Sequence, residues 1–355
     1  MWLENKIFRE DMAQTTSAEW LPWERLKDKS ILITGATGLI GYYLVSTLVL
    51  RNIEHGNRIR IRALVRDEER ARRQFADALA MDGNGLEFVV GDLEHIPVVE
   101  GPVDYIIHGG SPTASRFFAE KPVETVIMNM SGITSLLEMA KAKKVQGFTY
   151  LSSMEVYGSV TTTEKVDEQH ACFMDSMSPR SSYPEVKRLI ENLCADYHSE
   201  YQVPANVIRL TQTFGPGFRD SDNRVWAQFI RSGLKHEPII LKTLGLTSRS
   251  YLYLADAVTA ILTVLLLGKP GEAYNAANET SLCTIRDMAE LVAEVAPEGP
   301  NGEKSEVRIE QDPDAGKIYP PDKHMDLDTT KLTKLGWRPK TDLCNMYIRT
   351  IDSIG

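Results

Sequence analysis

The glycine-rich stretch at residues 35–41 constrains the fold of this chain more than any other stretch. It reads Gly-Ala-Thr-Gly-Leu-Ile-Gly and lies between an apolar run at 30–34, typical of a buried strand, and a helical pattern at 42–50. Glycines in such a unit allow a tight turn and let a pyrophosphate approach the helix N-terminus, whose dipole favours negative charge. The predicted cofactor contacts are Gly35, Thr37, Gly38, Leu39, Ile40 and Gly41.

Strand and helix patterns alternate after this unit. Strands are predicted at 58–65, 86–90, 103–108, 147–152 and 205–210, and helices at 67–80, 122–143 and 181–201. Such alternation predicts a parallel sheet with helices on both faces, which is a Rossmann-type doubly wound α/β fold. Beyond residue 210 the regularity falls, so we expect a smaller, irregular C-terminal lobe that binds the substrate.

These patterns divide the chain into three parts. An N-terminal extension at 1–26, with Trp2, Trp20 and Trp23, is expected to pack on the main domain. The Rossmann domain is predicted at 27–211, with 247–267 returning to it. The substrate lobe is predicted at 212–246 and 268–355.

Composition excludes several classes of protein. The net charge of −9, with no basic block, argues against a nucleic-acid binder. Four cysteines lie far apart without a CxxC pair, so neither a disulfide framework nor a metal site is expected. The longest apolar run, 257–267, is about half of the ~20 residues that a membrane span needs. With no signal peptide visible, we expect a cytoplasmic protein without membrane segments.

The ends of two predicted strands bear on the cofactor. Arg66 suits the 2′-phosphate of NADP, whereas Asp67 suits the adenosine ribose of NAD; together they can also be a solvated charge pair at a helix start. Asp92, after the third strand, is placed to reach the adenine, or it is only a turn residue. We expect NAD, and Arg66 keeps NADP open.

A possible catalytic trio combines Ser153 with Tyr183 and Lys187. The last two are four residues apart, so they lie on one helix face. A free tyrosine has a pKa near ~10, too high for a base at neutral pH, but a nearby ammonium and a cationic nicotinamide favour the phenolate. Tyr183 can then take a proton from a substrate alcohol. Lys187 would tune that phenol and hold the nicotinamide ribose, while Ser153 would bind the reacting oxygen.

With these motifs in this order, the chain resembles the extended short-chain dehydrogenase/reductase family of nucleotide-sugar epimerases, dehydratases and decarboxylases. The similarity runs from about residue 30 to residue 339. It rests on the glycine loop, Asp92-Leu93, Asn129-x-x-Gly132, SSMEVYG at 152–158, Tyr183 with Lys187, TFGPG at 213–217, RSYLYLAD at 249–256 and LGWxP at 335–339.

This resemblance implies a tightly held NAD, hydride transfer at sugar C4 and a nucleoside diphosphate in the C-terminal lobe. It adds Leu93, Gly109 and Asn129 to the cofactor site and makes Arg249 a contact to phosphate or sugar. It also implies a homodimer in which the helices at 122–143 and 181–201 join those of a second subunit in a four-helix bundle. The alternative is that both apolar stripes face their own sheet.

Within this family the chain is most similar to the UDP-glucuronate decarboxylases (UDP-xylose synthases). Such enzymes oxidise C4, lose CO2 from the resulting β-keto acid and reduce the ketone with the same NADH. The similarity rests on Ser111-Pro112-x-Ala114-Ser115, Ser153-x-Glu155-Val156-Tyr157-Gly158, Pro179-Arg180-x-x-Tyr183-x-x-x-Lys187-Arg188 and Asp222-x-Arg224-Val225. It implies that Glu155 is a further catalytic residue and that the substrate contacts are Ser111, Arg180, Gln212, Arg224, Val225 and Arg249.

Two adjacent residues bear on the product. The family's 4,6-dehydratases place an Asp-Glu pair after the hydroxyl residue, giving an acid and a base for water loss. Here Met154 takes the Asp position, and a thioether cannot donate a proton, so dehydration is disfavoured. Glu155 is kept, although it can also be a loop carboxylate that caps a neighbour. A 4-epimerase or 4,6-dehydratase for another nucleotide sugar and a non-catalytic NAD(P)-binding regulator are the other interpretations, and Gln212 at a usual Asn position leaves the sugar open.

Overall fold

A seven-stranded parallel sheet forms the centre of the computed structural model, which describes residues 5–112, 115–160, 162–311 and 324–354. In spatial order its strands are β10 (Ala273–Ala276), β6 (Ala205–Leu210), β5 (Gly147–Ser153), β4 (Tyr105–His108), β1 (Ser30–Thr34), β2 (Arg60–Val65) and β3 (Leu86–Val90). The strand order reverses between β1 and β4, and ligands of such sheets bind at the carboxyl ends of the strands beside this point. The predicted doubly wound α/β fold is confirmed.

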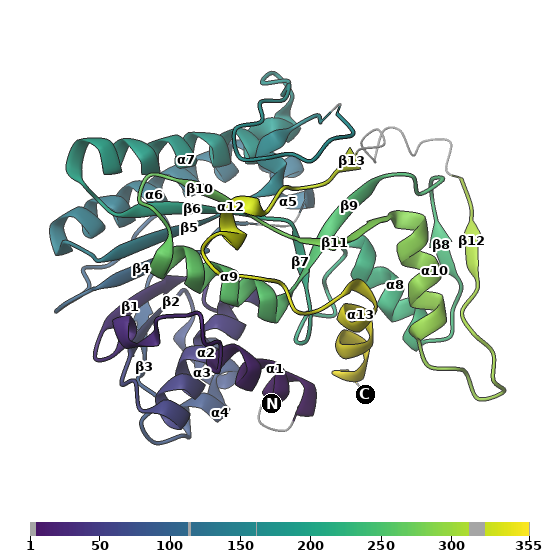
Figure 1. The fold of residues 1–355 in the computed structure, drawn as a ribbon, viewed down its shortest axis with the longest axis horizontal. Coiled ribbons are helices and arrows are strands. Elements are labelled where there is room, and N and C mark those ends of the chain that lie inside the picture. The colour runs from purple at the N-terminus through teal and green to yellow at the C-terminus, as the bar shows by residue number, and fades with distance from the viewer. Residues whose placement is uncertain (1–4, 113–114, 161, 312–323, 355) are drawn as a thin grey trace.

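Helices cover both faces of this sheet (Figure 1). One face carries α2 (Leu39–His55), α3 (Glu68–Gln74), α4 (Ala76–Leu79) and α9 (Leu254–Leu267), and the other carries α6 (Pro122–Lys143), α7 (Ser182–Tyr201) and the adjoining α5 (Ser115–Glu120). Each face has its own apolar core, with Ile33 and Ile261 in one and Leu136 and Ile190 in the other. Because both faces are covered, most strand residues are apolar and buried, as in β1 and β4, while the edge strand β3 is partly exposed.

A smaller lobe with its own sheet lies at the carboxyl ends of the central strands, beside the first sheet in Figure 1. Strand β9 (Ser248–Tyr253) pairs there with β7 (Gln212–Phe214), β11 (Asn278–Thr284) and β13 (His324–Met325), and β8 (Ile239–Leu241) pairs with β12 (Val307–Ile309). The helices of this region are α8 (Val225–Leu234), α10 (Ile285–Val295) and α13 (Leu343–Asp352), whereas α12 (Thr330–Thr333) packs against β10 of the central sheet.

The structure differs from the sequence prediction at several boundaries. Strand β2 begins at Arg60 rather than at 58, because Arg58 has a φ of 52°, which no extended strand adopts. The helix predicted at 67–80 is divided at Phe75, whose buried ring packs against Tyr42 and Phe88.

Two segments belong to a different sheet from the one that the sequence suggested. Strand β10 was expected in the substrate lobe but completes the central sheet, because it pairs in parallel with β6. Residues 247–267 were expected to return to the Rossmann domain. Only α9 packs on the central sheet, whereas β9 lies at the centre of the smaller one.

The N-terminal extension packs on the main domain through α1 (Lys6–Thr16) and the 3-10 helix η1 (Trp23–Leu26). Asp11 of α1 is 2% exposed, and it accepts hydrogen bonds from the Tyr253 hydroxyl at 2.5 Å and from Arg349 Nε at 2.9 Å. These partners lie on β9 and α13, so one carboxylate joins three distant parts of the chain. Among the described helices, none is long and apolar enough to cross a membrane.

Candidate active site

The loop between β1 and α2 is a cradle made of backbone. Gly35 has a φ of 71°, and a Cβ there would lie 2.6 Å from the carbonyl oxygen of Gly109. A Cβ at Gly41 would lie 2.2 Å from the carbonyl oxygen of Gly35. Within the described residues, no side chain caps the first turn of α2, so its N–H groups are open to an anionic ligand. This geometry fits the pyrophosphate of a dinucleotide.

Other predicted loop residues support this cradle. The carbonyl oxygen of Thr37 accepts hydrogen bonds from Gln74 Nε2 at 3.3 Å and from Arg219 Nη2 at 2.8 Å. Leu39 and Ile40 are half-buried against the core beneath α2. The loop is therefore held from both the first domain and the smaller lobe.

The carboxylates predicted to face the adenosine have structural roles in the folded chain. Asp67 Oδ1 accepts a hydrogen bond from the Arg70 N–H and caps α3. Asp92 Oδ1 accepts the N–H groups of Glu94 and His95 and closes a turn. Arg66 is exposed at the end of β2. Asp67 is thus a helix cap and Asp92 a turn residue, as the alternative interpretations held. Contacts of these residues to a cofactor stay predictions.

Beyond the glycine loop, the predicted cofactor site has a tightly packed wall. A Cβ at Gly132 would lie 3.1 Å from Leu93 Cβ, and a Cβ at Gly109 would lie 2.9 Å from Leu151 Cδ1. Asn129 is fully buried, and its Nδ2 donates to the Thr125 carbonyl at 2.7 Å. Among the described residues its Oδ1 has no hydrogen-bond partner, which suits a ligand that brings a donor.

The predicted trio comes together where β5 meets α7. Tyr183 and Lys187 are 7% and 3% exposed, and Lys187 Nζ lies 5.5 Å from the centre of the Tyr183 ring. Lys187 Nζ also donates a hydrogen bond to the Leu151 carbonyl at 2.9 Å. Ser153 ends β5, and its Oγ accepts the Glu155 N–H at 3.2 Å, at the start of the 3-10 helix η2 (Met154–Tyr157). The geometry therefore places a hydroxyl, a phenol and an amine around one point.

Burial dominates the protonation of this site. It raises the pKa of Tyr183 above its ordinary value; the Glu155 charge adds to this rise, and a hydrogen bond with Ser153 opposes it. Burial lowers the pKa of Lys187 to about 7, with Glu191 opposing. Burial in this site therefore favours the protonated phenol and works against the charged form of the lysine. Positive charge beside the phenol is needed before it can act as a base.

The neighbouring His108 is not a proton carrier at ordinary pH. Burial and the nearby Lys187 lower the pKa of His108 to about 3, so its ring is neutral. Its Nδ1 lies 2.7 Å from Thr34 Oγ1, and it packs against Tyr150. This agrees with the packing role that a strand-end histidine usually has.

Only some of the predicted substrate residues lie close to one another in the structure. Gln212 opens β7, which pairs with β9, the strand of Arg249, so the two lie on neighbouring strands. Gln212 Oε1 is buried, and no described residue is its hydrogen-bond partner. Arg249 is half-buried. Thr211, which precedes Gln212, contacts Met154 Sδ of η2 at 3.3 Å. The start of β7 therefore adjoins η2.

The remaining predicted contacts lie in loops or have other partners. Ser111 Oγ donates to the adjacent Pro112 carbonyl, and Arg180 is exposed in the 3-10 helix η3 (Pro179–Ser181). Arg224 caps α8 and is paired with Asp222, and Val225 is the first residue of that helix. Ala114, part of the quoted motif, lies outside the described residues. The Asp222 pair gives Arg224 a structural role that the sequence did not indicate.

Sequence reasoning also missed residues that contact the trio. The Phe118 ring of α5 stacks on Tyr183, with ring centroids 4.7 Å apart. Glu191 follows Lys187 by four residues on α7 and bonds Ser152 and Arg209. The spacing of Glu191 was a usable signal, because the helix face of Tyr183 and Lys187 continues to it. Nothing in the local sequence indicated Phe118.

Known proteins show similarity to nearly the whole chain. A family described as the NAD dependent epimerase/dehydratase family has a model that matches residues 31–277. The chain is 28% identical to UDP-glucuronic acid decarboxylase 4 of Arabidopsis thaliana, over 88% of this chain and 66% of that protein. It is 26% identical to the dTDP-D-glucose 4,6-dehydratase of Homo sapiens, over 91% of this chain and 89% of that protein.

Solved structures show the same architecture. An epimerase from Methanothermobacter thermautotrophicus superposes with a TM-score of 0.76 at 20% identity, covering 94% of each chain. The chain spans slightly less than two thirds of the length of the plant decarboxylase. Identities this low support a shared fold and family. They do not identify the substrate of this chain.

Proposed function

The chain belongs to the NAD-dependent epimerase/dehydratase family, and we propose that it modifies a nucleotide sugar through transient oxidation at C4, most specifically by decarboxylating UDP-glucuronate to UDP-xylose. The observation that carries the oxidation chemistry is that the buried Tyr183 and Lys187 lie together with the half-buried Ser153 at the carboxyl end of the sheet that also bears the glycine cradle. Bound NAD+ supplies the acceptor for the hydride that leaves the sugar carbon.

Each residue of the trio has a task in this proposal. Ser153 Oγ, at the end of β5, holds the C4 oxygen in place. Tyr183 takes the C4 hydroxyl proton, which requires positive charge to offset the effect of burial on its pKa. Lys187 supplies part of that charge as an ammonium 5.5 Å from the phenol ring. After ketone formation, Ser153 and Tyr183 can donate hydrogen bonds to the C4 oxygen.

Among the possible reactions, decarboxylation is the one that the neighbouring residues support best. Met154 is 6% exposed and packs with Val156, Val166 and Leu327, so no proton donor occupies the position that a dehydratase acid would need. A 4-keto sugar with a C6 carboxylate is a β-keto acid. It loses CO2 because the electron pair of the broken C5–C6 bond forms a C4–C5 double bond while the carbonyl pair moves onto the C4 oxygen. C5 then takes a proton, and the hydride removed from C4 would return there to give the xylose. Glu155 is exposed, and its charge acts on Tyr183, as expected for a carboxylate in the reaction pocket.

Incubation of the purified protein with UDP-glucuronate should release CO2 and form a UDP-pentose. Mass spectrometry of the nucleotide sugar distinguishes the outcomes. An unchanged mass with an altered sugar indicates a 4-epimerase, and loss of one water from an offered nucleotide hexose indicates a 4,6-dehydratase. An intact UDP-glucuronate pool after long incubation would contradict the decarboxylase proposal. The cofactor that copurifies, NAD or the NADP that Arg66 leaves open, can be identified in the same spectrum.

We also propose a homodimer formed through α6 and α7. The inner faces of both helices pack on their own sheet, but Val123, Ile127 and Leu189 are 68%, 54% and 50% exposed. Exposed apolar side chains on two adjacent helices suit an interface between copies. Sedimentation velocity should give twice the 39.8 kDa mass of the chain, and Ile127→Glu should return it to the monomer. A monomeric unaltered protein at micromolar concentration would refute the dimer.

A further inference from the structure

Glu191 extends the catalytic face of α7 by one more turn. Tyr183, Lys187 and Glu191 are spaced by four residues, so their side chains lie on one face of the helix, toward β5 and β6. The Glu191 side chain is 10% exposed and the Arg209 side chain of β6 is 14% exposed, and they form a salt bridge with an N–O distance of 2.6 Å. A nearly buried ion pair thus lies next to the buried lysine of the trio.

This pair is bonded to both segments that carry the other catalytic candidates. Ser152, the residue before Ser153, donates from its Oγ to Glu191 Oε1 at 2.5 Å. Arg209 Nη1 donates to the Tyr157 hydroxyl at 2.9 Å, and that tyrosine ends the short helix on which Glu155 lies. The pair therefore fixes the end of β5 and η2 relative to α7.

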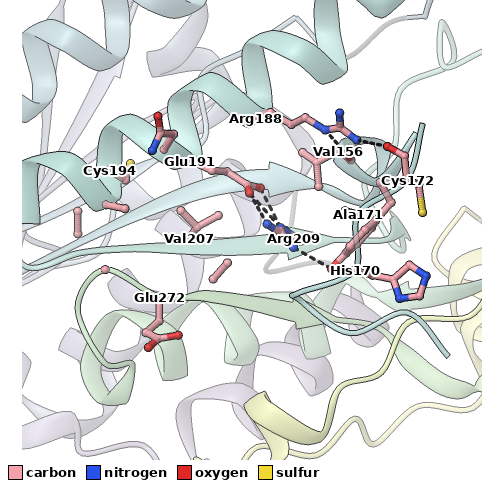
Figure 2. A pocket seen from close by; sticks show the side chains of 16 residues that line it. Val156, His170, Ala171, Cys172, Arg188, Glu191, Cys194, Val207, Arg209 and Glu272 are labelled. Carbon is pink, nitrogen blue, oxygen red and sulfur yellow. Dashed lines mark hydrogen bonds and ion pairs between the residues drawn. The ribbon is translucent and has the colours of Figure 1, made fainter. Parts of the chain in front are cut away.

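The same pair is accessible from outside the catalytic crevice. Figure 2 shows Glu191 and Arg209 pointing toward each other in a cavity of about 450 Å³ that both line. Arg188 crosses this cavity and donates hydrogen bonds to the carbonyls of Val156 and Cys172. Water in the cavity can solvate the pair, which reduces the cost of burying two charges. The pair can therefore keep its charges without occupying the substrate site.

We propose that the Glu191–Arg209 ion pair, one helical turn beyond Lys187, positions the trio by joining α7 to the end of β5 and to η2, and that its two opposite charges set the electrostatic field at Lys187. Both are positioning residues, since they act through Lys187, Ser153 and the turn at Glu155. The importance of this ion pair for catalysis rests on the proposed function. The electrostatic coupling between the ion pair and Lys187 does not.

The electrostatic surroundings of Lys187 support this coupling. Burial lowers its pKa to about 7, and the Glu191 carboxylate acts in the opposite direction. The titratable or charged groups around it are Tyr150 on β5, His108 on β4, Tyr183 and Glu191 on α7, and Arg209 on β6 through Glu191. Tyr150 and Tyr183 are protonated phenols and His108 is neutral; of the two carboxylates nearby, Glu155 on η2 acts on Tyr183 and Glu191 acts on Lys187.

A direct titration of Lys187 tests the proposal without any substrate. The protein is labelled with [ε-13C]lysine, the Lys187 signal is assigned by its loss in Lys187→Arg, and its chemical shift is followed against pH by NMR. Glu191→Gln removes a negative charge and should move the Lys187 midpoint to lower pH by about half a unit or more. Arg209→Gln leaves Glu191 uncompensated and should move the midpoint to higher pH.

Opposite shifts in the two variants are the result that a merely structural pair would not give. Unmoved midpoints, or shifts of the same sign, would overturn the proposal. If Glu191→Gln fails to fold, Glu191→Asp draws the carboxylate back by one methylene and should still move the midpoint to lower pH, so an unmoved midpoint there would also overturn the proposal. The double variant Glu191→Gln/Arg209→Gln should titrate between the two single variants. Because no turnover is measured, failure of the proposed function would leave these results unchanged.

Discussion

Tyr183→Phe is expected to lower turnover on the nucleotide sugar that the unaltered protein converts by about 10²- to 10⁴-fold, the contribution of a well-placed general acid–base group. The substitution removes only the hydroxyl that interacts with Ser153. The ring can still stack on Phe118, with centroids 4.7 Å apart in the unaltered protein, so the fold and the cofactor cradle should be preserved. Turnover is measured as product formed per enzyme in single-time-point mass spectra.

Tyr197→Phe is the matched control for this variant. Tyr197 lies on the same helix, and its hydroxyl donates to Glu138 at the surface, far along α7 from Ser153. Its turnover should stay within about twofold of the unaltered protein, since surface substitutions usually change little. Both variants should bind NAD with the same affinity by calorimetry. Full turnover in Tyr183→Phe would contradict the role of Tyr183 as the base, whereas no turnover even in the unaltered protein would favour a non-catalytic NAD(P)-binding regulator.

Asp11→Ala is expected to lower the free energy of unfolding by about 3 kcal/mol, as measured by urea denaturation. The substitution leaves the buried Tyr253 hydroxyl without its acceptor at 2.5 Å and takes one anionic partner from Arg349. Burial raises the pKa of the Asp11 carboxyl in spite of these partners. We therefore attribute the loss mainly to the stranded hydroxyl and guanidinium and less to the charge pair itself.

Glu10→Ala separates the contribution of an exposed ion pair with Arg349 from that of the buried Asp11 carboxylate. Glu10 also pairs with Arg349, at 3.2 Å, but its side chain is 46% exposed. Exposed pairs contribute up to about 1 kcal/mol, so this variant should lose at most that amount. The slope of unfolding against urea should be equal in both variants, because the same surface is exposed. Equal losses of stability in the two variants would contradict a special role for the buried carboxylate.

Much of the central sheet could be predicted from the sequence because its signals are local. The strands at 86–90 and 205–210 and the helix at 122–143 have the predicted bounds, since apolar runs and helical periodicity mark them directly. Strand β10 could not be predicted in the same way. Its four residues, Ala-Tyr-Asn-Ala, carry no strong strand pattern, and they form a strand by pairing with the edge of β6, which is distant in sequence.

Contacts within the site could likewise be predicted only where the two contacting residues are close in sequence. Tyr183 and Lys187 could be placed on one face from their spacing alone, and the structure places them there. The partners of Arg209 could not be foreseen, because Glu191 and Tyr157 meet it only when β6, α7 and η2 are packed. Sequence motifs thus identify which residues are candidates, and tertiary contacts decide which of them have structural partners.

The bond between Asp11 and Arg349 joins residues 338 positions apart, which sets the order of events during synthesis. The helix that carries Asp11 is made long before the segment that carries its partner, Arg349. Loop closure over such a separation cannot precede the assembly of the segments between. The bond from Asp11 to Arg349 should therefore form late, after α1 can already pack on α2 and α9, so it closes the fold rather than starting it.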